Sequence, residues 1–373
     1  MTVPPRFALS DAERRLRADA TAIAEHWRPR DRRALTRDQL LSLFQTLAPL
    51  GYLRSTLTPP DDADGPAVLS FAAVVEGLSP DLPLLGNHSV QRYLAADGNA
   101  DQRSRYLQPL LAGRSIAGIA ISEPGVGGDL RAITTRARRT DLGYVLDGRK
   151  HWVTHGTTAD LFVVLAMFDA GPTRFLVPGD TPGLTRTPMQ PSGLSHLSFA
   201  TLTFEACEIG RAQLFGREGA GLDGAKAAFP IARLLAGLQA IRLGEAAVNR
   251  ALVFAAARQV FGRRVIEAES VTSAAATLRS RLESARLLCY RGLTELDDGA
   301  GVNALAAGAK AIATDAAVAA AAWAKALLGA AALEARDPIV RLADDCDMMA
   351  VVDGTAALNR LVAGRAIRKA VPA

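Results

Sequence analysis

The chain has 373 residues, of which 49% are hydrophobic and 22% charged, and this is the composition of an ordinary globular protein with room for two or three packed regions. The formal net charge is +5, but the basic residues are spread along the chain instead of forming one long run, which argues against a nucleic-acid-binding arm. The three cysteines are far apart and predict neither a disulfide framework nor a metal site, so we expect a reducing, cytoplasmic setting.

The first region, residues 1–114, is predicted to be helical. Ser10 to Glu13 has the pattern of a capping box, and Thr36 opens a second helix that continues through Leu47. The segment 59–66, which contains three prolines and three aspartates, predicts a loop. The start of the chain carries acidic residues and lacks the apolar core of a signal peptide, so we expect no targeting segment there.

The second region, residues 115–222, is predicted to be a β-domain. Apolar runs at 144–146, 161–165 and 174–177 have the length of strands. Asp147-Gly148 and Pro182-Gly183 are predicted as the turns that separate such strands.

The third region, residues 223–373, returns to a helical pattern rich in Ala, Leu and Arg. Its most apolar stretch, 311–332, is interrupted by Asp315 and Lys325, and this predicts a buried helix and no membrane span. The order of helical, β and helical regions differs from the strand–helix alternation that builds parallel sheets.

Two motifs stand in the predicted β-domain. Residues 121–129 read Ile-Ser-Glu-Pro-Gly-Val-Gly-Gly-Asp, and residues 148–154 read Gly-Arg-Lys-His-Trp-Val-Thr. Either segment alone is compatible with an ordinary β-turn. No dinucleotide-binding glycine fingerprint, Walker loop, zinc motif or nucleophile elbow is present. The ordered pair, in a β region between helical regions, resembles the acyl-CoA dehydrogenase family, and the resemblance continues at 251–262 and 353–360.

The resemblance implies a mixed α and β fold. The expected parts are an N-terminal helical domain (1–114), a middle β-barrel or sandwich domain (115–222) and a C-terminal four-helix bundle (223–373). It also implies FAD as the cofactor and an acyl thioester, either acyl-CoA or an acyl-carrier protein, as the substrate. In such a dehydrogenation a carboxylate removes the α-proton, and a hydride leaves the next carbon for flavin N5.

The residues that the resemblance assigns to FAD come from all three motif regions. The backbone around Ile121 and Ser122 would meet the isoalloxazine, Trp152 would pack beside it, and Thr154 would hydrogen-bond near N5. Arg258 and Phe261 would complete the site of a neighbouring subunit, at the diphosphate and the adenine. The remaining expected FAD contacts are Gly127, Gly128, Gly329, Thr355 and Asn359. Out of context, Trp152 would be a core indole, Arg258 a solvated helix end and Gly329 a helix kink.

The candidate catalytic base is Asp353, which stands where the family usually has Glu. The alternative position for a family base is Ala232, which cannot take up a proton. Asp is shorter than Glu by about 1.5 Å, although related nitroalkane oxidases use Asp as their base. If Asp353 is not the base, it is a loop aspartate that caps a turn. Substrate contacts are expected from Gly128, Arg233, Val352 and Gly354.

Three functions remain open at the level of the sequence. The first is an acyl-CoA or acyl-carrier-protein dehydrogenase with Asp353 as base. The second is a flavin oxidase or oxygenase on the same scaffold, and the third is a degenerate FAD-binding subunit. A short match at 178–193 favours the subgroup of the family that acts in polyketide biosynthesis. The expected partners are an electron-transfer flavoprotein and further copies of the chain, as a homodimer or homotetramer, with no nucleic acid, membrane or metal.

Overall fold

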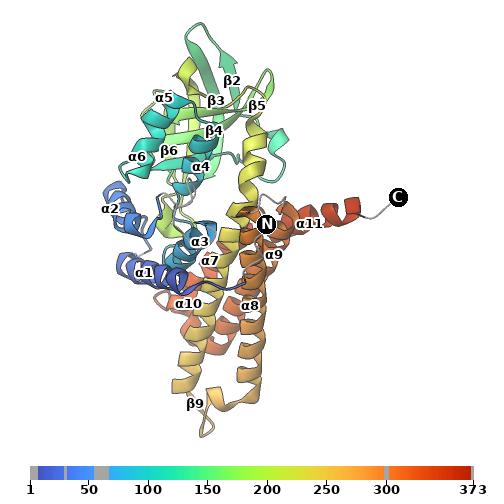
Figure 1. Ribbon diagram of the computed structural model, residues 1–373. Helices are drawn as coiled ribbons and strands as arrows, with labels where there is room; N and C mark the ends of the chain where they lie inside the picture. Colours follow the sequence, from blue (N-terminus) through green and yellow to red (C-terminus); the bar gives the residue numbers. More distant parts are fainter. Residues whose placement is uncertain (1–6, 29–31, 54–66, 298–301, 371–373) are drawn as a thin grey trace.

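The computed structural model describes residues 7–28, 32–53, 67–297 and 302–370. The expected loop at 59–66 therefore lies outside the described residues. A β-sheet forms one end of the molecule, a bundle of long helices forms the other, and the N-terminal helices lie along one side of both (Figure 1). The predicted three-part architecture is confirmed.

The N-terminal region is helical, as predicted. The expected capping box at Ser10 is formed, because the Glu13 backbone N–H donates to Ser10 Oγ at 3.3 Å. Thr36 opens α2 as predicted, and it also forms a capping box that was not predicted, in which the Gln39 N–H donates to Thr36 Oγ1 at 3.3 Å. The helices are α1 (Asp11–Trp27), α2 (Arg37–Leu47), α3 (Ala67–Leu78), α4 (His88–Asp97), α5 (Ala100–Gln102) and α6 (Gln108–Leu111), with a π-helical turn at Arg103–Leu107.

The middle region is an eight-stranded sheet of order β6-β7-β3-β2-β4-β5-β8, in which β1 pairs in parallel with β4. Its strands are β1 (Ala117–Ala120), β2 (Arg136–Arg139), β3 (Gly143–Val153), β4 (Leu161–Phe168), β5 (Gly171–Pro178), β6 (Leu184–Pro188), β7 (Ala200–Gly210) and β8 (Leu214–Phe215).

The predicted turn at Asp147-Gly148 is wrong, because β3 continues through both residues. The register of β3 against β7 shifts between Leu146 and Gly148, which marks a β-bulge. Gly148 has a φ of 141°, and a Cβ at this position would lie only 2.6 Å from Thr135 Cα. A glycine that permits a bulge and a glycine that permits a turn look the same in the sequence.

The C-terminal region is built around α9 (Asn303–Leu328), which packs against α7 (Gly221–Ala257), α8 (Glu269–Asp297), α10 (Pro338–Val351) and α11 (Ala356–Ala370). Small alanines dominate its buried positions, so the neighbouring helices can approach closely. The segment Asn303–Leu333 is long and apolar enough to cross a membrane by composition. The helix packs against four other helices, and 13 of its 26 residues are buried.

Helix α7 runs from the sheet to the far end of the bundle (Figure 1). There a hairpin of β9 (Gln259–Val260) and β10 (Arg263–Arg264) joins it to α8. Both loop residues of the hairpin, Phe261 and Gly262, have positive φ values of 50° and 78°, which suits a two-residue turn. The hairpin therefore projects away from the sheet that carries the two sequence motifs.

The domain limits at 114 and 222 stay predictions, and they can be placed relative to the helices and strands. Helix α6 ends at Leu111 and β1 begins at Ala117, which brackets the limit at 114. Strand β8 ends at Phe215 and α7 begins at Gly221, so the limit at 222 lies at the second residue of α7.

Candidate active site

The candidate base lies in a tight turn between α10 and α11. Asp353 has a φ of 53° and Gly354 one of 94°, so two successive residues adopt left-handed backbone. A Cβ on Gly354 would meet Leu358 at 3.2 Å. Left-handed backbone is uncommon for a residue other than glycine, and it costs free energy unless the surroundings impose it.

Three side chains from three helices impose this turn. Lys310 on α9 donates to the carbonyls of Ala350 at 3.1 Å and Gly354 at 2.7 Å. Asn359 on α11 donates to the Gly354 carbonyl at 2.8 Å, and Arg233 Nε on α7 lies 3.5 Å from the Asp353 carbonyl oxygen. All three side chains are buried. The turn is therefore anchored through its backbone, which leaves the Asp353 carboxyl for chemistry.

The Asp353 carboxyl has the properties of a proton acceptor. It is half-buried, and no described residue donates a hydrogen bond to its oxygens. Burial raises the pKa of Asp353 above its ordinary value, while the charges of Lys310 and Arg233 act in the opposite direction. Burial in turn lowers the pKa of Lys310 to about 8, although the nearby Asp353 raises it. A carboxylate with a raised pKa and no fixed partner suits general-base catalysis.

The two sequence motifs are joined by a buried ion pair. Lys150 Nζ in β3 donates to Glu123 Oε1 at 2.7 Å and to the Ile121 carbonyl at 2.9 Å, and both side chains are almost fully buried. The Glu123 carboxylate also accepts from the backbone N–H groups of Thr134 and Thr135, at 2.6 and 2.9 Å. Burial opposes ionisation, but these donors lower the pKa of Glu123 to about 2. The pair fixes the Ile121 and Ser122 backbone against β3.

Next to this pair the surface is shaped for a flat ligand. The His151 N–H donates to the Ser122 carbonyl at 2.8 Å, which places the first motif beside Trp152. Trp152 has a φ of 58° and a side chain that is 46% exposed, unusual for an indole at the end of a strand. Gly127 has open space where a Cβ would stand. An exposed aromatic face beside open backbone fits a planar isoalloxazine, so these residues fit FAD.

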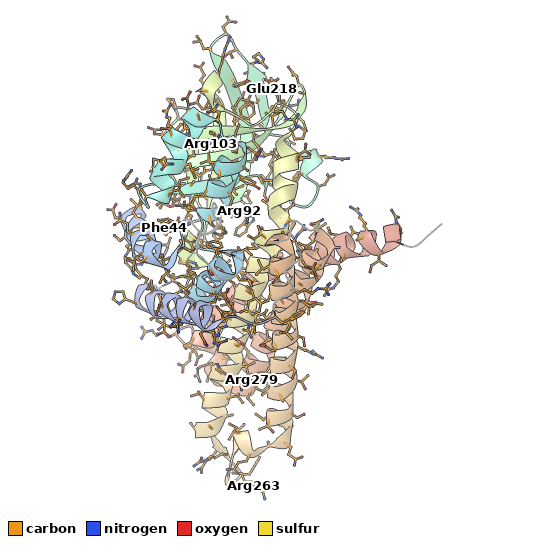
Figure 2. The ribbon with its side chains drawn as sticks, in the orientation of Figure 1. Phe44, Arg92, Arg103, Glu218, Arg263 and Arg279 are labelled. Atoms are coloured by element: carbon orange, nitrogen blue, oxygen red, sulfur yellow. The ribbon has the colours of Figure 1, made fainter. Side chains whose placement is uncertain are left out.

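A very small cavity lies between the first motif and α4, with a volume of about 10 Å³, which is room for about one water molecule. Tyr93 lines it and also interacts electrostatically with Asp353; burial raises the pKa of Tyr93 to about 12, and Arg174 and Asp353 act on it in opposite directions. Arg92, the neighbour of Tyr93, lies where the sheet end meets the helical end (Figure 2). The cavity is lined by Tyr93, Ile119, Ile121, Val163, Leu165, Arg174 and Gly221.

The other predicted FAD residues divide into two groups. Arg258 and Phe261 lie at the hairpin end, where Figure 2 labels Arg263, far from the sheet end labelled by Glu218. Phe261 is fully exposed at the tip of this hairpin, which lies at the opposite end of the molecule from the sheet that carries Trp152. Gly329, with a φ of 58°, ends α9.

Thr355 and Asn359 lie beside the base. Thr355 is exposed and caps α11 through its hydroxyl, and Asn359 is buried and hydrogen-bonds the Asp353 turn. Asn359 Oδ1 has no partner among the described residues. Their contacts with FAD stay predictions.

Sequence reasoning missed four side chains of the site: Tyr93, Lys150 in its role as ion-pair partner, Arg174 and Lys310. Lys310 and Arg174 carried the clearest signal, because each is a single cation inside an otherwise apolar stretch of the sequence. The partner of such a cation depends on which elements pack together, and the sequence pattern does not specify that.

Two family models match the chain: the middle domain of acyl-CoA dehydrogenase at residues 118–207 and its C-terminal domain at 219–368. The mitochondrial short-chain specific acyl-CoA dehydrogenase of Mus musculus is 33% identical over 278 residues, which cover 73% of this chain and 68% of the relative. Benzylmalonyl-CoA dehydrogenase of Aromatoleum aromaticum is 29% identical, covering 87% and 89%. The structure of butyryl-CoA dehydrogenase from Megasphaera elsdenii superposes with a TM-score of 0.89 at 25% identity, covering 97% and 100%.

Proposed function

Because the chain belongs to the acyl-CoA dehydrogenase family, we propose that it is an FAD-dependent dehydrogenase of an acyl thioester with Asp353 as its catalytic base. The observation that carries the assignment of the base is the Asp353 turn. A half-buried carboxylate with a raised pKa stands on a backbone held by Arg233, Lys310 and Asn359.

In the proposed reaction the cofactor accepts the hydride and a side chain of the protein accepts the proton. Bound FAD supplies the two-electron acceptor for the hydride that leaves the β-carbon. Asp353 takes the proton from the α-carbon, so that the thioester becomes an α,β-unsaturated thioester. Val352 forms part of the wall beside the base, and the Glu123–Lys150 pair holds the Ile121–Ser122 backbone where the cofactor ring would lie.

The test is the Asp353→Asn variant, which keeps the shape of the side chain and removes the proton acceptor. We expect substrate-dependent flavin bleaching to fall by about 10² to 10⁴ while FAD stays bound. The matched control is Asp347→Asn on the exposed face of α10, which should leave bleaching unchanged. Bleaching at the wild-type rate in Asp353→Asn would make Asp353 a turn residue and would favour the oxygenase or degenerate-subunit alternatives.

The assembly is part of the same proposal. Phe261 is fully exposed at the end of the bundle, and a second copy of the chain would bring this hairpin to an FAD site. We therefore propose a homodimer or a pair of such dimers. Arg258 would donate charge-assisted hydrogen bonds to the FAD diphosphate of that second copy.

The carrier of the acyl group and the electron acceptor are finer parts of the proposal. CoA is the simpler carrier, because the relatives named above act on CoA thioesters by name. A carrier protein would present the same thioester, as the polyketide-subgroup match at 178–193 predicts. An electron-transfer flavoprotein in the cytoplasm is the proposed acceptor, and rapid reoxidation by air would instead favour an oxidase.

A further inference from the structure

Two aromatic side chains hold the half-exposed indole of Trp152 at its edges. The ring of Phe199, which directly precedes β7, meets the indole edge-on, with centroids 5.8 Å apart and planes at 79°. The His151 ring meets the indole in the same way, at 5.7 Å and 72°. His151 is itself held in place, because its Nδ1 shares a hydrogen bond with Thr201 Oγ1 at 2.8 Å. Edge-to-face contacts of this kind fix the plane of a ring and leave part of its surface open.

The loop that carries Phe199, residues 193–199, has a strained backbone. Leu194 and Ser198 flank a 3₁₀ turn with φ values of 51° and 42°, in the left-handed region that residues other than glycine seldom adopt. Both residues are buried, so the strain lies within packed structure. Such conformations cost free energy and persist only where the surroundings impose them. The loop is therefore held in a particular position, beyond what a connection between two strands requires.

Helix α10 provides one anchor for this loop. The Leu194 N–H donates to Asp345 Oδ1 at 2.6 Å, and Asp345 is buried. A Cβ on Gly193 would lie 2.5 Å from the Asp344 carbonyl oxygen, so the loop and the helix approach each other backbone to backbone. Helix α10 ends two residues before Asp353. The element that leads to the candidate base thus also holds the loop.

The second motif provides the other anchor. The Leu197 carbonyl accepts from the His155 N–H at 2.9 Å, directly after Thr154. The Ser198 hydroxyl shares a hydrogen bond with Thr158 Oγ1 at 3.0 Å. The loop is therefore fixed at the same time to the motif that contains the indole and to the helix that precedes the base.

We propose that Phe199 is a positioning residue, which keeps the Trp152 indole in the orientation that receives the isoalloxazine of FAD, and that Asp345 fixes the loop that presents Phe199. The inference rests on the proposed function, which places FAD at the Trp152 surface. A ring that is already held in its bound orientation loses little freedom when the cofactor binds, so binding is tighter. Because α10 anchors the loop, the cofactor surface and Asp353 keep a constant separation.

The first measurement needs no cofactor. Replacing Trp27 and Trp323 by Phe leaves Trp152 as the sole tryptophan of the full chain, whose time-resolved fluorescence anisotropy is recorded without FAD. We expect this indole to move only with the whole molecule, and Phe199→Leu to add a fast component of local motion. In the FAD-loaded protein, Phe199→Leu should weaken the quenching of flavin fluorescence by the indole. It should also raise the Kd for FAD about 2- to 10-fold, the range that corresponds to one edge-to-face ring contact.

The matched control is Phe168→Leu. Phe168 is 6% exposed, as Phe199 is, and it also makes an edge-to-face contact, with the Tyr144 ring at 5.7 Å and 77°. Its other ring contact is with Phe175, at the far end of β4 and β5 from the motifs. The control therefore loses a similar contact in the same sheet. It should leave the motion of the sole indole and the Kd for FAD unchanged.

The anchor is tested by a second pair of variants. Asp345→Ala removes the acceptor of the Leu194 N–H and should loosen the indole, whereas Asp344→Ala, which removes a partly exposed ion pair with Arg32, should not. Gly193→Ala removes no charge and no hydrogen-bonding side chain. It forces the loop away from α10 and should loosen the indole in the same way, even if Asp345→Ala fails to fold.

The outcomes separate the two proposals. If Phe199→Leu alters the indole motion and the Kd for FAD no more than Phe168→Leu does, the positioning role is overturned and the dehydrogenase still stands. A Trp152 ring that already moves freely in the parent protein overturns the role as well. If the wild-type chain binds no FAD, the proposed function fails and the role of Phe199 toward the flavin fails with it.

Discussion

The buried Glu123–Lys150 pair offers the sharpest test of how the motifs are held together. Lys150→Met removes the Nζ that contacts Glu123 Oε1 at 2.7 Å and the Ile121 carbonyl at 2.9 Å. Breaking a buried pair by removing one partner costs about 3–5 kcal/mol, because a charge is left uncompensated. Thr134 and Thr135 still donate to the carboxylate, so we expect the lower half of that range, as measured by urea unfolding at pH 7.

The pH dependence gives a second signature of the same pair. The pKa of Glu123 is about 2 in the folded chain and 4.5 ordinarily, so between these values the unfolded state binds more protons. The stability from this pair is therefore present above pH 4.5 and is lost as the pH falls through 2. Lys150→Met should flatten this part of the stability profile.

The matched controls are a surface substitution and a double variant. Lys325→Met, at an exposed position of α9, should change the free energy of unfolding by less than about 0.5 kcal/mol. Glu123→Gln combined with Lys150→Met should recover part of the loss, because no buried charge remains. A loss below about 1 kcal/mol in Lys150→Met, with an unchanged acid profile, would refute the role given to this pair.

Further predictions concern the base and the far hairpin. The bleaching rate should fall as the pH drops through the raised pKa of Asp353. Lys310→Met removes a cation that lowers this pKa, so the pH at which the rate falls should be higher in the variant. An unchanged pH dependence would contradict the assignment of Asp353 as the base. Asn359→Leu removes the amide that donates to the carbonyls of the turn, and it should lower the free energy of unfolding by about 1–3 kcal/mol. The same variant should lose a larger fraction of its kcat than of its affinity for FAD. Arg258→Ala should weaken FAD retention more than it harms the fold, and a fully active monomer in sedimentation would rule out a shared FAD site.

The sequence predicts the architecture well because its signals are local. The capping box at Ser10, the helix start at Thr36, the strand-length runs and the Ala-rich helix each depend on neighbouring residues, and each appears in the structure. The failure at Asp147-Gly148 has the same origin. The local pattern of a turn and of a bulge is identical, and the decision depends on pairing with a strand more than fifty residues away.

The candidate site is less predictable, because its parts meet only in three dimensions. Asp353 could be named from its motif, but Lys310 is separated from it by more than forty residues and Arg233 by more than a hundred. Arg174 and Asp97 likewise come from different regions of the chain. A lone cation in an apolar run indicates that a partner exists, while only the packing of helices and strands identifies the partner.

The anchoring of the turn bears on how a short base can serve this reaction. A carboxylate on a side chain one carbon shorter reaches about 1.5 Å less far, a distance that matters because a displacement of about 1 Å in a catalytic group can cost about a hundredfold in rate. Here the backbone of Asp353 is fixed by hydrogen bonds from three helices and held in a left-handed conformation. The fixed backbone gives the short Asp353 carboxylate a defined position, whereas a longer Glu side chain could adjust its own reach. If the turn has been placed to suit Asp, Asp353→Glu will push its carboxylate too far and lower the bleaching rate. If instead the turn lies as it does in relatives with Glu, the same substitution will preserve or raise it, so the variant measures where the backbone stands relative to the substrate.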